Sequence, residues 1–101
     1  MKKELTKRQK QVLSVLKYGG ENLTTTKTIT KLTGISPRDI RQIISDLRED
    51  YPICSTTYNG GGYFIANTNK EIGRFIKGIQ NRINEHEVTI TNMIRHVNKL
   101  R

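Results

Sequence analysis

The chain has 101 residues, a formal net charge of +9 and a hydrophobic fraction of 34%. This length fits one small domain with one appended element, and it excludes a multi-substrate enzyme with a deep cleft. Basic residues number 18 against 9 acidic ones. That balance favours a polyanionic partner, nucleic acid first, over a soluble protein whose lysines are only solvated.

The positive charge lies at the two ends of the chain. Residues 1–18 carry +5 and residues 70–101 carry +4, whereas residues 51–69 carry no charge. The single cysteine, Cys54, cannot form an internal disulfide, which fits a reducing compartment. There is no apolar run long enough for a membrane span or a signal peptide. We therefore expect a cytoplasmic protein without a membrane partner.

The first predicted element is a helix over residues 6–17, where apolar residues form a narrow stripe at helical spacing. Gly19 and Gly20 are expected to end it. Residues 22–26 are rich in threonine and could form a short strand.

A second short helix is predicted over residues 26–33, with Ile29 and Leu32 facing inward. Gly34 breaks it, at a point where a sharp turn needs a left-handed backbone. The segment has the spacing of a helix-turn-helix, whose required apolar and turn positions are Ile29, Gly34, Ile35, Ile40 and Ile43. Thr30 departs from this pattern, since alanine usually stands there to let the two helices approach.

A third helix is predicted to start after Ser36 and to stop before Pro52. Ser36, Pro37 and Asp39 supply an N-cap, a proline at the first helical position and an acid at the third, a variant of the capping box. The apolar residues that follow at helical spacing define its buried face: Ile40, Ile43, Ile44 and Leu47.

Two β-rich runs, residues 52–58 and 63–66, flank a glycine turn and predict a hairpin. The order of elements is helix, possible strand, helix, sharp turn, helix, hairpin, which is the layout of a winged helix-turn-helix. We therefore expect a mainly α fold with a small β-hairpin wing, followed by a long C-terminal helix. Residues 1–66 would form the winged domain and residues 67–101 the C-terminal helix.

A family resemblance is carried by ITKLTGIS at 29–36, IRQIISDLR at 40–48, Pro52-Ile53 and GGGY at 60–63. These stretches resemble the winged helix of the biotin-repressor type, and they are similar to small winged-helix proteins of phages and other mobile elements. The resemblance covers residues 5–66. It implies binding of double-stranded DNA, with the third helix (36–49) in the major groove and the wing (53–66) on the backbone.

The outer face of the third helix holds the candidate base-reading residues. Arg38, Arg41 and Gln42 project near its N-terminus, where recognition helices meet base edges, and arginine pairs with guanine as glutamine does with adenine. An ordinary solvated helix face is the other interpretation. The predicted DNA-binding residues are Ser36, Arg38, Arg41, Gln42, Ser45, Arg48, Thr57, Tyr58, Asn59, Lys7 and Arg8.

Two parts of this predicted interface have a second interpretation. The wing has no lysine or arginine, so it would contact phosphates through uncharged donors, or it would only close the domain. The N-terminal basic cluster opposes the dipole of the first helix, a cost that phosphate contact would explain, and a frayed, solvated terminus is the equal alternative. That cluster is Lys2, Lys3, Lys7, Arg8 and Lys10. Cys54 is predicted to be a small strand residue without a catalytic role.

Residues 67–101 are predicted to be a dimerisation element. Their apolar side chains and one histidine recur in a heptad register, which a second copy would cover most economically. The predicted dimerisation residues are Ile72, Ile76, Ile79, Ile83, His86, Ile90, Met93, Val97 and Leu100. The β-branched run at 88–91 favours an alternative, in which the segment breaks near Glu87 into two shorter helices.

The leading hypothesis is a small homodimer that binds duplex DNA sequence-specifically, as a transcriptional regulator or as a replication or recombination accessory of a phage-like element. The alternative is a winged domain that binds protein, such as a phage-encoded inhibitor or recruiter of a host protein complex. The uncharged wing and the acidic flank of the third helix favour that alternative. The sequence holds no nucleophile–base pair, metal cluster or phosphate loop, so we predict neither an enzyme nor a cofactor or metal.

Overall fold

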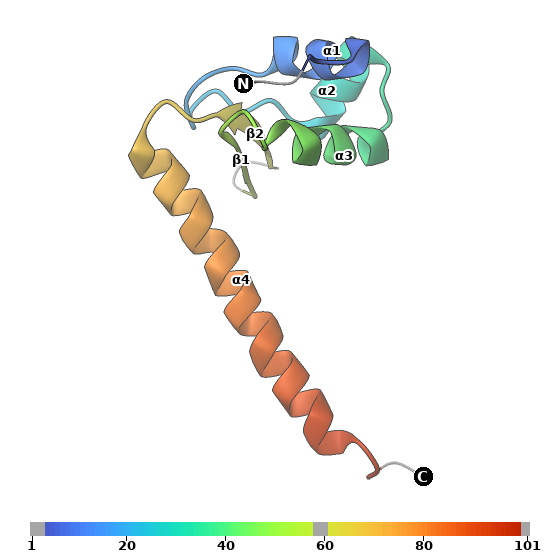
Figure 1. Cartoon of the computed structure of the whole chain (residues 1–101), viewed down its shortest axis with the longest axis vertical. Coiled ribbons are helices and arrows are strands. Elements are labelled where there is room, and N and C mark those ends of the chain that lie inside the picture. The colour runs from blue at the N-terminus through green and yellow to red at the C-terminus, as the bar shows by residue number, and fades with distance from the viewer. Residues whose placement is uncertain (1–3, 58–60, 100–101) are drawn as a thin grey trace.

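The computed structural model describes residues 4–57 and 61–99. Its elements in chain order are α1 (Lys7–Val15), α2 (Thr26–Thr33), α3 (Pro37–Leu47), β1 (Ile53–Thr56), β2 (Gly62–Ile65) and α4 (Asn69–His96). Three helices and the hairpin pack together, and α4 runs away from them as a long arm (Figure 1). The longest dimension of the molecule is 52 Å. The predicted fold class, mainly α with a hairpin wing and a long C-terminal helix, is confirmed.

A capping box that the sequence analysis missed starts α1. The Thr6 hydroxyl accepts a hydrogen bond from the backbone N–H of Gln9 at 3.1 Å, and the Gln9 side chain accepts one from the Thr6 N–H at 2.9 Å. The helix ends at Val15, two residues earlier than predicted, because Leu16 has an extended backbone. Gly19 therefore does not end the helix; its φ of +90° places it in the loop that follows.

The possible strand at residues 22–26 is reduced to a single bridge. Thr24 exchanges backbone hydrogen bonds of 3.0 and 2.9 Å with Tyr63 of β2. The next residue, Thr25, is already the N-cap of α2, since its side chain accepts from the N–H of Thr28. The start of α2 thus leaves no room for a longer strand.

The core lies between the three short helices and the hairpin, whose strands pair antiparallel with Ile53 opposite Ile65. Its buried residues are Val12, Leu16, Ile29, Ile35, Ile40, Ile43, Ile44, Leu47, Ile53 and Ile65. The four apolar residues predicted for the inner face of α3 are all among them. The prediction for Leu32 is wrong, because it is 62% exposed. The inner side of α2 is instead formed by Ile29 with the half-buried Thr30 and Thr33.

The hydroxyl of Thr30 is buried and has no hydrogen-bond partner among the described residues. An unpaired buried hydroxyl costs about 1–3 kcal/mol. We therefore expect Thr30→Val, which keeps the shape and removes the hydroxyl, to raise the free energy of unfolding by about 1 kcal/mol. Thermal unfolding should then show a melting temperature several degrees higher.

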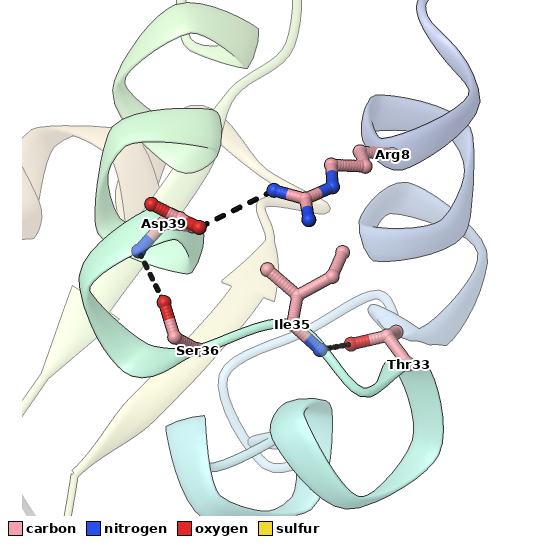
Figure 2. A network of polar contacts seen from close by, with 5 residues as sticks. All are labelled: Arg8, Thr33, Ile35, Ser36 and Asp39. Atoms are coloured by element: carbon pink, nitrogen blue, oxygen red, sulfur yellow. Dashed lines mark hydrogen bonds and ion pairs between the residues drawn. The ribbon is translucent and has the colours of Figure 1, made fainter.

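The matched control for this prediction is Thr33→Val, three residues further along the same helix. The Thr33 hydroxyl donates to the Ile29 carbonyl at 2.7 Å. It also accepts from the Ile35 N–H at 3.2 Å, the bond that Figure 2 shows. Its removal leaves a backbone N–H without that partner, so the control should lower the melting temperature. Two substitutions with the same sign would show that hydrogen bonding does not decide the effect.

The long helix α4 is continuous through the β-branched run at 88–91, so the alternative of two shorter helices is wrong. The hydroxyls of Thr89 and Thr91 donate to the carbonyls of Glu85 and Glu87, at 3.1 and 3.0 Å. These bonds give the polar β-branched residues partners inside the helix, which offsets part of their low helix propensity.

The helix α4 ends at His96, whereas the sequence predicted a helix that continues to residue 101. Val97 has an extended backbone and Asn98 a φ of +70°. Val97, predicted as a heptad position, therefore lies beyond the helix, and Leu100 lies outside the described residues. None of the helices in residues 4–57 and 61–99 combines the length and the apolar character that a membrane span requires.

Candidate nucleic-acid interface

The outer face of α3 carries five of the residues predicted to contact DNA. Ser36, Arg38, Arg41, Gln42 and Ser45 are all exposed, and the opposite side of the helix is buried in the core. Within the described part of the chain, neither Arg38 nor Arg41 makes a hydrogen bond or an ion pair. Both guanidinium groups are therefore free to meet an anionic partner.

The N-terminus of α3 is capped, and the acid nearest to it is paired with a base (Figure 2). The Ser36 hydroxyl accepts from the N–H of Asp39 at 3.2 Å, as predicted. The Asp39 carboxylate makes an ion pair of 3.2 Å with Arg8 of α1, so the variant capping box is only half formed. Arg8, predicted as a DNA contact, thus compensates the negative charge beside the helix end. The ion pair contributes little to the stability of the fold, because both side chains are at least half exposed.

Two other predicted contact residues make hydrogen bonds inside the protein. The Gln42 amide donates to the Asp46 carboxylate on the acidic flank of α3 at 3.1 Å. The guanidinium of Arg48 turns towards the hairpin, where Nε donates to the Ile53 carbonyl at 2.8 Å and Nη2 to the Ser55 hydroxyl at 3.4 Å. Arg48 therefore links the C-terminal end of α3 to β1, a role that the sequence analysis missed.

Arg48 also contacts α4. Its guanidinium carbon lies 4.8 Å from the ring centroid of Phe75, a cation–π distance. Burial lowers the pKa of Arg48 from its ordinary value, but an arginine stays charged at every ordinary pH. One side chain thus connects the end of α3 to two other elements, β1 and α4.

The remaining predicted contact residues lie on the wing and on α1. Thr57 is exposed just after β1, and Lys7 is exposed in the first turn of α1 beside Arg8. Tyr58 and Asn59 lie outside the described residues, and so do Lys2 and Lys3 of the basic cluster.

A groove of about 870 Å³ lies between the α1–α2 loop, the hairpin and α4. Phe64, Phe75 and Arg82 line it together with Cys54, which is buried and has a free thiol. Burial raises the pKa of that thiol, which disfavours a reactive thiolate. The described residues contain no group of three or more acidic, histidine or cysteine side chains that could hold a metal ion.

The carboxylate of Glu71 holds the first turn of α4 against the domain. It accepts hydrogen bonds from the backbone N–H of Gly20 at 2.6 Å and of Asn67 at 2.7 Å. Thr68 caps the helix by accepting from the N–H of Glu71 at 3.2 Å. The bonds from Asn67 and Gly20 lower the pKa of Glu71 below its ordinary value.

These bonds predict a pH-dependent contribution of Glu71 to stability. Its pKa is lower in the folded state, so the contribution is complete above the ordinary value of 4.5 and is lost as pH falls through the folded pKa. We expect Glu71→Gln to be less stable than wild type at pH 7, with the difference closing in acid. Urea unfolding between pH 3 and about 7 measures it. Glu85→Gln, at an exposed carboxylate of the same helix, should show no such difference.

One face of α4 is apolar and uncovered. Ile76, Ile90 and Met93 are each 58% exposed and Ile83 is 44% exposed. At ~100° per residue these side chains fall on one side of the helix, with exposed His86 among them and Val88 on the opposite side. Ile72 and Ile79, nearer the domain, are half-buried. The α4 side that meets the domain, marked by Glu71, Phe75 and Arg82, lies about a quarter turn away.

The fold is that of a helix-turn-helix with a β-hairpin wing. It is similar to the solved structure of wild-type ZitR from Lactococcus lactis, with a TM-score of 0.50 and 17% sequence identity, over 98% of this chain and 76% of that one. At this identity the likeness shows the fold alone. Neither a protein-family model nor a curated protein matches the chain.

Proposed function

We propose that this protein binds double-stranded DNA sequence-specifically and regulates transcription. The observation that carries the proposal is the outer face of α3, where Arg38 and Arg41 are exposed and make no bond to another described residue. Because α3 is the second helix of a helix-turn-helix, its N-terminal residues would enter the major groove. Arginine there recognises guanine through two hydrogen bonds.

The electrostatics around α3 support this proposal. The Arg8–Asp39 ion pair reduces the repulsion that a free carboxylate would exert on a phosphate near the helix N-terminus. Lys7 and Lys10 are both exposed on one side of α1. They would add sequence-independent affinity for phosphates. The uncharged Thr57 of the wing would position the protein on the backbone without adding charge.

The proposal includes a homodimer formed through α4. Its exposed apolar side is too long for the small domain to cover, and β-branched residues at Ile76, Ile83 and Ile90 favour a parallel pair. Two copies related by a two-fold axis would recognise two half-sites on DNA.

Selection of bound duplexes from a random pool tests both parts of the proposal. We expect a two-fold symmetric site, and a salt-dependent mobility shift with the selected duplex. The absence of a shift with any duplex at low salt would disprove DNA binding. An asymmetric single site would disprove the dimer but not DNA binding. A stoichiometric protein partner that survives nuclease treatment, together with only micromolar DNA affinity, would favour the protein-binding alternative.

A further inference from the structure

We propose that Arg48 is a positioning residue, which fixes the direction of α4 relative to α3 and so sets the half-site spacing that the dimer accepts. The inference rests on the proposed function. It reassigns a residue that the sequence placed on DNA to a role inside the protein.

Arg48 joins the end of α3 to the wing. Arg48 is the C-cap residue of α3, so its backbone moves with the helix that would read DNA. Its Nε is bonded to the Ile53 carbonyl and its Nη2 reaches the Ser55 hydroxyl. Two donors of one planar group therefore hold α3 and β1 in a defined relation, and that plane has little freedom left.

The same guanidinium plane also contacts α4. The guanidinium lies 4.8 Å from the Phe75 ring centroid. One turn earlier on the same side of α4, Glu71 is fixed to Gly20 and Asn67. A helix held only at Glu71 could pivot about its first turn, whereas two points, Glu71 and Phe75, define its direction.

The length of α4 converts a small change in its direction into a large displacement of its far end. The α4 residues that meet the domain lie about a quarter turn from the apolar side, which is exposed at Ile76, Ile83, Ile90 and Met93. The 28 residues of α4 span about 42 Å. A tilt of about 10° would thus move its far end by roughly 7 Å relative to α3, which is about two base pairs along DNA. The Arg48–Phe75 contact is therefore placed where a small loosening changes the distance between two reading helices.

The experiment measures affinity for a single half-site and for paired half-sites whose spacer varies by one base pair. Wild type should prefer one spacing by tenfold or more. Arg48→Lys keeps the charge but loses the planar fork, so it should bind the half-site within twofold of wild type and prefer no spacing by more than threefold. Phe75→Leu, which removes only the ring, should behave in the same way. Arg95→Lys, an exposed arginine near the far end of α4, is the control and should keep the wild-type preference.

Each other outcome overturns the inference. Unchanged spacing preference in Arg48→Lys and Phe75→Leu would show that the contact does not set the arm. An equal loss on half-sites and paired sites would return Arg48 to direct DNA contact or to a structural role, and circular dichroism separates these two. A wild-type protein that binds DNA without a preferred spacing also overturns the inference, while leaving DNA binding intact. Failure of the proposed function is distinct, since wild type would then bind no duplex at all.

Discussion

Replacement of both Arg38 and Arg41 by alanine should lower affinity for the selected duplex by about a hundredfold or more. Both side chains are exposed on the outer face of α3 and are not bonded to other described residues. Each arginine that pairs bidentately with guanine contributes about 1–3 kcal/mol of discrimination. Because the core face of α3 is untouched, the variant should melt like wild type.

Fluorescence anisotropy with the selected and a scrambled duplex, at one salt concentration, measures this effect. The matched control removes the same charge elsewhere, by replacing Arg95 and Lys99, both exposed near the far end of the chain. It should weaken both duplexes slightly and alike. If the Arg38 and Arg41 variant also weakened both duplexes alike, these residues would contact only phosphates and the sequence would be read elsewhere.

Substitution of Ile90 by aspartate should separate the proposed dimer into monomers. Ile90 is 58% exposed in the single chain, so the change leaves the winged domain intact and places a charge in the proposed interface. Light scattering after gel filtration should give the chain mass of 11.6 kDa instead of twice that value. Affinity for a duplex with two half-sites should fall by about 10²–10⁴-fold, because the second half-site is no longer bound intramolecularly.

Val88→Asp is the control for this substitution. Val88 is 61% exposed, lies two residues from Ile90 and is also β-branched, but it projects from the opposite side of α4. The control should remain dimeric. Dissociation of both variants, or of neither, would show that the apolar side of α4 is not the dimer interface.

Local patterns in the sequence were sufficient to predict α3 and the hairpin. Ser36 and Pro37 start the helix through contacts within one turn, and the apolar spacing of α3 is long enough to define its inner side. The α2 helix has only eight residues, so its inner side depended on which neighbours packed against it. Leu32 was misplaced for that reason. The capping box of Thr6 and Gln9 was readable from its three-residue spacing but was overlooked.

The sequence was sufficient to predict which exposed residues belong to the candidate site, but not the contacts that its side chains make with other elements. Exposure of Arg38 and Arg41 follows from the periodicity of one helix. The orientation of Arg48 does not, because its partners Ile53 and Phe75 belong to other elements. The Arg8–Asp39 pair joins residues 31 positions apart. No pattern in a single sequence reveals such a contact, since it depends on how α1 packs against α3.

In the proposed dimer, the bare side of α4 would make the stability of the protein depend on its own concentration. No residue of α4 is fully buried in the single chain, and from residue 80 onward every described residue is exposed. A helical stretch without packing is only marginally stable in water. In the proposed dimer the arm gains its order from the second copy, so each tenfold rise in protein concentration favours the paired, ordered state by about 1.4 kcal/mol. Dilute protein would thus consist of single chains with one reading domain each, and accumulation of the chain would itself assemble the form that recognises a symmetric site.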